Sequence, residues 1–179
     1  MESKSRTFPT ALARLVDDPA PGGRDGFIAI LNAGLPTKRI ISQGLLRDEK
    51  GRVLLCELTY KSEWDLPGGV VEVGEAPAPG LVRELREELD VGVEVHGLVT
   101  VNWLPAWRGW DDACIFLFDL GTADASLVDR MSLQPTEIKA VHWCDPATVR
   151  ERATAATVAL LEGLDGGDER TYREAPPGP

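Results

Sequence analysis

Short apolar and alternating runs along the chain predict a series of β-strands that begins near residue 39. Residues 39–48 ("RIISQGLLRD") and 51–60 ("GRVLLCELTY") both have strand patterns, and the turn "DEKG" between them indicates a hairpin. A short strand, "VVEV" at 70–73, follows the loop "KSEWDLPGG". Later strands are expected in three further apolar or alternating segments, residues 93–104, 112–120 and 138–143.

The segment after "VVEV" has the pattern of a helix packed on a core. At about 100° per residue, Leu81, Leu85 and Leu89 fall on one side with Val82 beside them, which makes an apolar stripe. Pro79 suits the first turn of this helix, where its missing N–H is harmless. We expect the helix to end near Leu89.

A second helix is predicted over residues 145–164, with Asp145 as its N-cap and Gly163 near its end. Strands therefore both precede and follow the first helix, and a helix closes the series. This order predicts a mixed sheet covered by helices, in the α/β or α+β class.

The two ends of the chain have weaker patterns. "FPTALARLV" at 8–16 favours a short helix, "DDPAPGGRDG" at 17–26 a turn or loop, and "FIAIL" at 27–31 a strand or a helical turn. The C-terminal segment is polar and rich in Pro and Gly. We therefore expect an N-terminal extension, a domain and a polar mobile tail, over residues 1–37, 38–163 and 164–179.

Composition narrows the class of protein. The chain has 179 residues, of which 43% are hydrophobic and 27% charged, as expected for a globular domain. The formal net charge of −10 argues against a nucleic-acid or anionic-membrane partner held by bulk electrostatics. This negative net charge does not exclude a small anionic substrate, because a metal bound in the site dominates the local electrostatic field.

Location and thiol chemistry follow from the same sequence. It has no apolar run of about 18 residues and no N-terminal apolar core of signal-peptide type, so we expect a cytoplasmic protein without a membrane span. Cys56, Cys114 and Cys144 lie in strand-like segments, which favours free thiols over a zinc site. His96 and His142 also lie in such segments and are expected to be ordinary sheet residues.

The central helix carries an unusual group of acids. Glu84, Glu87 and Glu88 share one arc of about 100°, where like charges repel by a few tenths of a kcal/mol per pair. Arg83 lies one turn from Glu87 and offsets part of this repulsion. A divalent cation offsets far more, and Mg²⁺ prefers such hard oxygen ligands. The alternative is a solvated acidic face with i,i+4 salt bridges.

The spacing of this helix and the loop before it resembles the Nudix box of MutT-like hydrolases, G-x5-E-x7-R-E-U-x-E-E-x-G-U, where U is a bulky aliphatic residue. The match is carried by Gly69, Glu75, Arg83, Glu84, Leu85, Glu87, Glu88 and Val91. "WDLPGG" at 64–69 also resembles the approach to the box. Asp90 stands where the family has a glycine that leaves the helix with positive φ. Aspartate adopts that conformation at modest cost, so we expect altered capping and retained metal binding.

The resemblance implies an α/β/α sandwich with a mixed sheet, which is an α/β fold. It also implies metal-dependent hydrolysis of a nucleoside diphosphate linked to another moiety, by water attack on phosphorus. Mg²⁺, or Mn²⁺ as a substitute, would be bound by Glu84, Glu87 and Glu88, with the Gly69 carbonyl as a further oxygen. Arg83 would orient the glutamates by salt bridges.

Glu75 is expected to be a partner of Arg83 or a hydrogen-bond acceptor in the loop. The general base is expected to be either a box glutamate or a later acid. Glu137, which starts a strand after a loop, is the first choice among the later acids, followed by Asp111 and Asp112.

Substrate recognition is expected in the loop after the fourth predicted strand. Trp103, Trp107 and Trp110 cluster there, and flat aromatic rings can stack on a base or another planar group. Core packing accounts for Trp103 equally well, so Trp107 and Trp110 are the candidates, with Arg108 for a phosphate. The expected partner is a small-molecule diphosphate, and the chain is expected to be a monomer or a homodimer.

Three alternatives have different sequence signals. Non-catalytic Nudix-fold binding modules commonly lose box glutamates, and all of them are present here. A hydrolase of a non-nucleotide diphosphate would share the box. An enzyme like isopentenyl-diphosphate isomerase would need a catalytic cysteine near the site, and Cys56 lies in a predicted strand without such a context.

Overall fold

The computed structural model describes residues 23–106 and 109–175. The chain divides into two units, residues 1–37 and residues 38–179. The described part of the first unit is one helix, α2 (Gly23–Gly34), in which Phe27 is buried. The sequence predicted a turn or loop up to residue 26 and left strand or helical turn open for 27–31, so helix replaces loop at 23–26. The helix predicted at 8–16 lies outside the described residues.

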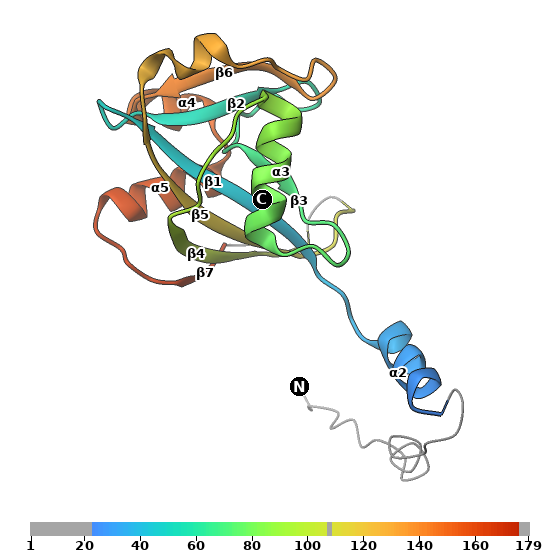
Figure 1. The fold of residues 1–179 in the computed structure, drawn as a ribbon. Coiled ribbons are helices and arrows are strands. Elements are labelled where there is room, and N and C mark those ends of the chain that lie inside the picture. Colours follow the sequence, from blue (N-terminus) through green and yellow to red (C-terminus); the bar gives the residue numbers. More distant parts are fainter. Residues whose placement is uncertain (1–22, 107–108, 176–179) are drawn as a thin grey trace. The chain divides into compact units, whose positions relative to one another are not determined.

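The described part of the second unit is built on a seven-stranded mixed sheet (Figure 1). Its order is β6-β2-β1-β5-β4-β7, and β3 also pairs with β1. The parallel pairs are β1 with β5 and β4 with β7; the others are antiparallel. The strands are β1 (Arg39–Asp48), β2 (Val53–Leu58), β3 (Gly68–Val70), β4 (Gly97–Leu104), β5 (Ala113–Ala123), β6 (Ile138–Cys144) and β7 (Tyr172–Glu174).

Helices cover both faces of this sheet, which confirms the α/β/α sandwich. α3 (Pro77–Leu89) packs on one face through Leu81, Leu85 and Leu89, each of them 0% exposed. α4 (Pro146–Arg152) and α5 (Ala155–Asp165) contribute to a second core on the other face.

Neighbouring residues of the first hairpin supply the two cores in turn. Leu46 and Leu54 join the core under α3, whereas Leu45 and Leu55 join the core under α4 and α5. Successive strand side chains point to opposite faces of a sheet, so one apolar run serves both layers. The predicted hairpin is confirmed, and Gly51 takes the positive φ that its turn requires (76°).

The single helix predicted over 145–164 is interrupted. Asp145 caps α4 as expected, but Ala153 and Thr154 have extended backbone between the two helices. Two contacts fix this break. The backbone N–H of Trp64 donates to the Arg152 carbonyl (2.9 Å), and the Thr154 hydroxyl accepts from the Thr157 N–H (3.2 Å). The long-range backbone bond and the new N-cap therefore override the local helical pattern.

Two further predictions differ from the structure. The short strand expected at 70–73 lies earlier, because β3 ends at Val70 after pairing with β1. The segment expected to be a mobile tail, 164–179, contains β7, which pairs with β4, and Arg173 within it is ion-paired to Asp168. Residues 176–179 lie outside the described residues.

Cys56, Cys114 and Cys144 are free thiols, and the first and last are buried. Burial raises the pKa of Cys144 to about 11, so this thiol stays protonated and unreactive at neutral pH. Within residues 23–106 and 109–175, no helix has the length and apolar character needed to cross a membrane.

Candidate active site

Helix α3 places the acids of the glutamate motif beside a buried apolar stripe. It begins after Ala76 with Pro77 in the first turn and ends at Asp90, which has the left-handed conformation (φ 53°, ψ 39°). The Asp90 N–H donates to the Arg86 carbonyl (3.1 Å), and Val91 then turns back into the core, 8% exposed. The expectation that aspartate serves as the helix exit is confirmed.

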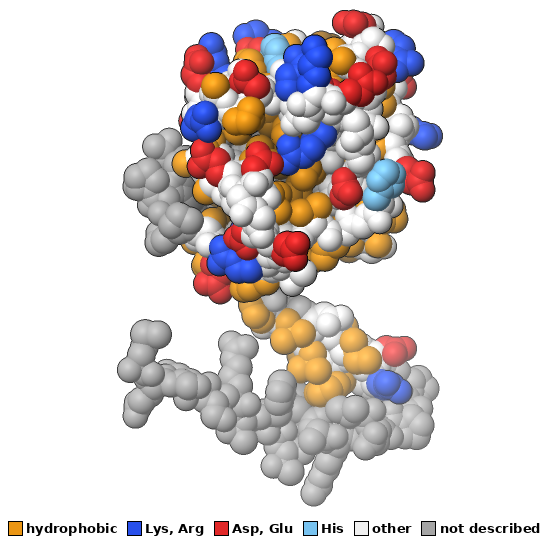
Figure 2. All heavy atoms as spheres, turned by 90° about the vertical axis from the view of Figure 1, so that its left-hand side faces the viewer, with side chains coloured by type: hydrophobic (Ala, Val, Ile, Leu, Met, Phe, Trp, Pro, Cys, Tyr) orange, Lys and Arg blue, Asp and Glu red, His pale blue; other side chains and the backbone are white. Residues whose placement is uncertain are grey.

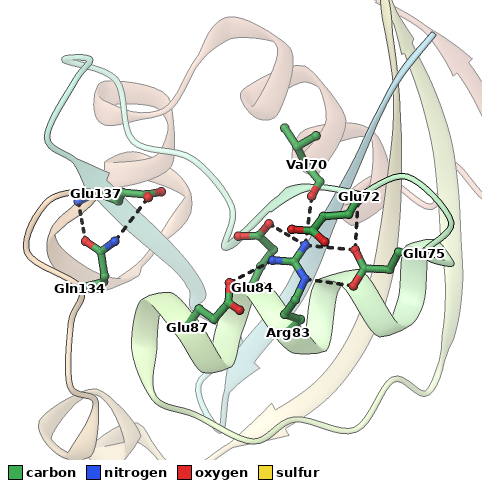
Figure 3. Close-up of polar contacts among 8 residues, drawn as sticks. All are labelled: Val70, Glu72, Glu75, Arg83, Glu84, Glu87, Gln134 and Glu137. Carbon is green, nitrogen blue, oxygen red and sulfur yellow. Dashed lines mark hydrogen bonds and ion pairs between the residues drawn. The ribbon is translucent and has the colours of Figure 1, made fainter. Parts of the chain in front are cut away.

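Arg83 is the centre of a network of carboxylates on α3 and the loop before it (Figure 3). Its guanidinium binds both oxygens of Glu75, with Nε and Nη2 each at 3.0 Å. It also contacts Glu87 through Nη1 and Glu84 through Nη2, both at 3.0 Å. Nη2 donates in addition to the Val70 carbonyl at 3.2 Å. One cation therefore organises three acids and the end of β3.

Glu75 is the partner of Arg83 that the sequence suggested. The hydrogen bonds from Arg83, followed by the backbone N–H of Glu72, lower the pKa of the Glu75 carboxyl. A bidentate arginine–carboxylate pair is geometrically specific, so it fixes the guanidinium in the orientation that meets Glu84 and Glu87.

Gly69 allows the backbone of β3 to approach the Glu84 carboxylate closely. A Cβ at position 69 would lie 2.5 Å from Cδ and 2.6 Å from Oε2 of Glu84. Burial raises the pKa of Glu84, while the charge of Arg83 lowers it in part. The Gly69 backbone and the Glu84 carboxylate are thus in close contact, and we call this contact the Gly69 cradle.

Glu88 and Glu137 come from distant parts of the sequence and meet at the C-terminal end of α3. Glu88 is 8% exposed. Its pKa is raised to about 8, first by burial, then by a hydrogen bond with the Glu137 side chain and by repulsion from Glu84. Glu137 lies in the turn before β6, and this turn is fixed to the helix by the Gln134 N–H, which donates to the Glu88 carbonyl (2.8 Å).

The donor set fits a hard divalent cation. Carboxylates of Glu84, Glu87 and Glu88 gather on one face with the Gly69 cradle beside them, and their mutual repulsion calls for a cation. In the conformation described for residues 23–106 and 109–175, no three Asp, Glu, His or Cys side chains already stand as a metal-binding group. Arg83 engages both Glu84 and Glu87 instead, and the Glu87 side chain, 61% exposed, has room to turn away from it.

The tryptophan loop lies between β4 and β5. Trp110 is 62% exposed, and the Arg39 guanidinium lies 4.7 Å from the centre of its ring. Trp103 is half-buried and donates from Nε1 to Asp112 (3.1 Å). Trp107 and Arg108 lie outside the described residues.

Asp112 also pairs with Lys38, whose hydrogen bond is the first cause of its lowered pKa, followed by the bond from Trp103. The Asp111 carbonyl accepts from Arg39 Nη2 (3.0 Å). The contacts described for these two alternative bases are with Lys38, Arg39 and Trp103, whereas the Glu137 side chain is hydrogen-bonded to that of Glu88.

Sequence reasoning missed two polar hubs that shape the site. Asp65 accepts from Gln43 (3.1 Å), Lys61 (2.8 Å), the Leu66 N–H (2.9 Å) and Thr157 (3.0 Å), which anchors the loop that leads to Gly69. The second hub is Gln134, whose side chain caps the turn before Glu137. Of the two, only Gln134 could have been noticed in the sequence. Its polar side chain stands two and three residues before Thr136 and Glu137, whose N–H groups it accepts from.

Comparisons with known proteins agree on one family. The model of the NUDIX domain matches residues 38–162. A "MutT-like protein" of Streptomyces ambofaciens is 34% identical over 132 residues, which cover 73% of this chain and 80% of the relative. A "CTP pyrophosphohydrolase" of Escherichia coli K12 is 30% identical over 122 residues, which cover 65% of this chain and 84% of the relative.

Solved structures show the same fold at lower identity. A MutT protein from Methanosarcina mazei Go1 has a TM-score of 0.64 at 23% identity, covering 76% of this chain and 99% of that protein. A UDP-X diphosphatase has a TM-score of 0.61 at 17% identity, covering 91% and 94%.

Proposed function

The chain belongs to the Nudix hydrolase family, and on that premise we propose that it is a metal-dependent pyrophosphohydrolase of a nucleoside diphosphate linked to another moiety. The observation that carries the proposal is the carboxylate cluster of α3. Three glutamates share one face, a glycine cradle lies beside Glu84, and a fourth carboxylate, Glu137, meets Glu88. Such a cluster is costly for a purely structural helix and useful for binding a cation.

Glu84, Glu87 and Glu88, with the Gly69 carbonyl, would hold Mg²⁺, or Mn²⁺ in its place. When bound, the cation supplies charge neutralisation for the diphosphate and lowers the pKa of a water molecule. Arg83 holds Glu84 and Glu87 on the same side of the helix through its contacts at 3.0 Å. The bidentate pair with Glu75 fixes the position of the Arg83 guanidinium.

Glu137 is the proposed general base. A hydrogen bond joins its side chain to that of Glu88, which places Glu137 beside the proposed metal ligands. In the reaction, Glu137 would accept the proton of the water that attacks phosphorus. Glu88 alone is the second candidate for this step, because it is the buried member of the pair.

We further propose that the substrate is of the nucleotide or nucleotide-sugar type. Two of the proteins named above are a CTP pyrophosphohydrolase and a UDP-X diphosphatase. The exposed Trp110 ring, with Arg39 over it, offers a flat surface and a positive charge for a base or another planar group. Trp107 and Arg108 are proposed for the same loop on the sequence alone.

The proposed partner is therefore a small molecule, bound by a cytoplasmic monomer or homodimer without nucleic acid or membrane. The net charge of −10 supports this. Figure 2 shows acidic and basic side chains intermixed over one face of the described residues. Extended nucleic acids are bound instead through clusters of Lys and Arg.

The test is a hydrolysis screen with Mg²⁺ or Mn²⁺, and with EDTA as the metal-free control. Substrates would include CTP and other nucleoside triphosphates, UDP-sugars, ADP-ribose, dinucleoside polyphosphates and prenyl diphosphates, with products separated by ion-exchange chromatography. We expect metal-dependent release of a nucleoside monophosphate from at least one nucleotide substrate. Turnover of prenyl diphosphates alone would show a non-nucleotide hydrolase. Tight binding without turnover would show a non-catalytic module.

A further inference from the structure

Gln134 organises the turn that carries Glu137, and no sequence motif pointed to it (Figure 3). Its side-chain oxygen accepts from the Thr136 N–H (2.8 Å), from the Glu137 N–H (3.1 Å) and from the Thr136 hydroxyl. Its side-chain NH₂ group also reaches a Glu137 carboxylate oxygen, at a long 3.4 Å. The acceptor bonds are the stronger ones, and they fix the backbone at Glu137.

The main chain of Gln134 joins this turn to the acidic helix. Its N–H donates to the Glu88 carbonyl (2.8 Å), and its own carbonyl accepts from the N–H groups of Glu137 (3.1 Å) and Ile138 (2.9 Å). One residue thus contacts the backbone of Glu88 and, through both its backbone and its side chain, Glu137. The relative placement of the two carboxylates depends on it.

We propose that Gln134 is a positioning residue for hydrolysis, which sets the direction in which the Glu137 carboxylate meets Glu88. This inference rests on the proposed function, in which Glu137 is the base. A displacement of a reacting group by about 1 Å can lower a rate by about 10²-fold, so the capping side chain of Gln134 affects catalysis without touching the substrate.

A purely structural turn residue would behave differently. Thr59 provides the matched control, because its hydroxyl donates to the Thr136 carbonyl (2.7 Å) and so supports the same turn from β2's end. The Thr59 N–H bond to the Glu137 carbonyl (2.9 Å) is a backbone bond and would survive a side-chain change. Thr59→Val therefore removes support from the turn without removing a bond to Glu137.

The experiment compares Gln134→Ala, Thr59→Val, Glu137→Gln and the double variant Gln134→Ala/Glu137→Gln on a substrate found by the screen. We expect Gln134→Ala to lower kcat by about 10-fold with KM within about twofold, since the change alters a reacting group and not substrate contacts. Thr59→Val should keep kcat within about twofold at a comparable loss of Tm. In the Glu137→Gln background, Gln134→Ala should lower kcat by less than about twofold more, because the group it positions is gone.

A readout without turnover accompanies the kinetics. The side-chain oxygen of Gln134 is the acceptor described for the Thr136 N–H. In Gln134→Ala, this amide should exchange with solvent at least about 10-fold faster by NMR, whereas core amides of β5 stay unchanged.

The outcomes separate the two levels of inference. If Glu137→Gln itself leaves kcat unchanged, the proposed base is wrong. If Glu137→Gln lowers kcat but Gln134→Ala does not, or if the two losses simply multiply in the double variant, the positioning role of Gln134 is overturned and the proposed base stands. Loss of activity in Thr59→Val equal to that in Gln134→Ala would likewise reduce Gln134 to a general support of the turn.

Discussion

Gly69→Ala tests the close approach between β3 and the acidic helix with a single added methyl group. Gly69 is not among the residues with positive φ, so alanine fits its backbone. The new Cβ would stand 2.5 Å from Glu84 Cδ, 2.6 Å from Oε2 and 2.8 Å from Oε1. Ordinary contact begins at 3.4 Å, so the Glu84 carboxylate must move by about 1 Å.

The size of this movement sets the expected loss. Glu84 binds Arg83 at 3.0 Å, and a shift of about 1 Å away from β3 disturbs both that ion pair and the proposed metal ligand. We expect kcat/KM to fall by about 10²-fold. The clash is with the flexible end of a side chain, so Tm should change by less than about 4 °C.

The assay combines steady-state kinetics, Mn²⁺ titration by calorimetry and a thermal melt. Gly97→Ala, at the start of β4, is the matched control, because a Cβ there meets nothing within 4 Å and should leave all three measurements near wild type. Gly68 is unsuitable, since its φ is 136° and a Cβ there would lie 2.1 Å from the Ser42 carbonyl oxygen. If Gly69→Ala kept kcat/KM and Mn²⁺ affinity within about threefold of wild type, the cradle would have no part in the site.

Three further substitutions probe the remaining features. Glu88→Gln should lower kcat by about 10²-fold or more. When the metal is removed with EDTA, Glu88→Gln should also raise Tm by about 2 °C or more, because it removes a buried carboxyl from a like-charged cluster. A lowered Tm would mean that misfolding caused the loss of kcat. Asp90→Gly should keep stability within about 1 kcal/mol and activity within about threefold, since both residues accept the left-handed helix exit; a 10-fold change in metal affinity would instead make Asp90 a ligand. Trp110→Ala should raise KM and lower kcat/KM by about 5- to 150-fold with an unchanged melt, because the ring is 62% exposed; an unchanged KM on every substrate would exclude stacking.

The features that the sequence predicted well are those with a local cause. The "DEKG" turn joins two strands because Gly51 supplies the positive φ, and α3 ends where Asp90 supplies another. The acids of α3 lie on one face because helical spacing puts them there. The bidentate pair between Arg83 and Glu75 also follows a fixed spacing across a short loop.

The features that the sequence did not predict depend on contacts with residues that are distant in the sequence. Residues 145–164 have no glycine or proline at the helix break, and the interruption comes from Trp64, whose N–H binds the Arg152 carbonyl. β7 forms in a polar segment because β4 offers it a free edge, and the partly buried Arg173 pairs with Asp168. A sequence pattern reflects only the residues within a short stretch of the chain, so it does not reveal contacts between distant segments.

The same division holds inside the site. Glu84, Glu87 and Glu88 were predicted from a motif, whereas Gln134 reaches Glu88 only because the chain returns to the end of α3 before β6. Asp65 stands in the "WDLPGG" stretch, yet its partner Thr157 belongs to a helix on the other face of the sheet. Motif spacing thus identifies the proposed ligands, and the folded chain identifies what holds them in place.

The burial of the three glutamates indicates which of them would move when a cation binds. The Glu84 side chain is 15% exposed and Glu88 is 8% exposed, so packing fixes both. Glu87 is 61% exposed, and the contact described for its carboxylate is the ion pair with Arg83. Such exposed pairs contribute about 0–1 kcal/mol, so exchanging this one for a metal bond costs little. On the proposed function, the helix would therefore present two preplaced carboxylates and one adjustable carboxylate, and Arg83 would restrain the adjustable one until a cation competes for it.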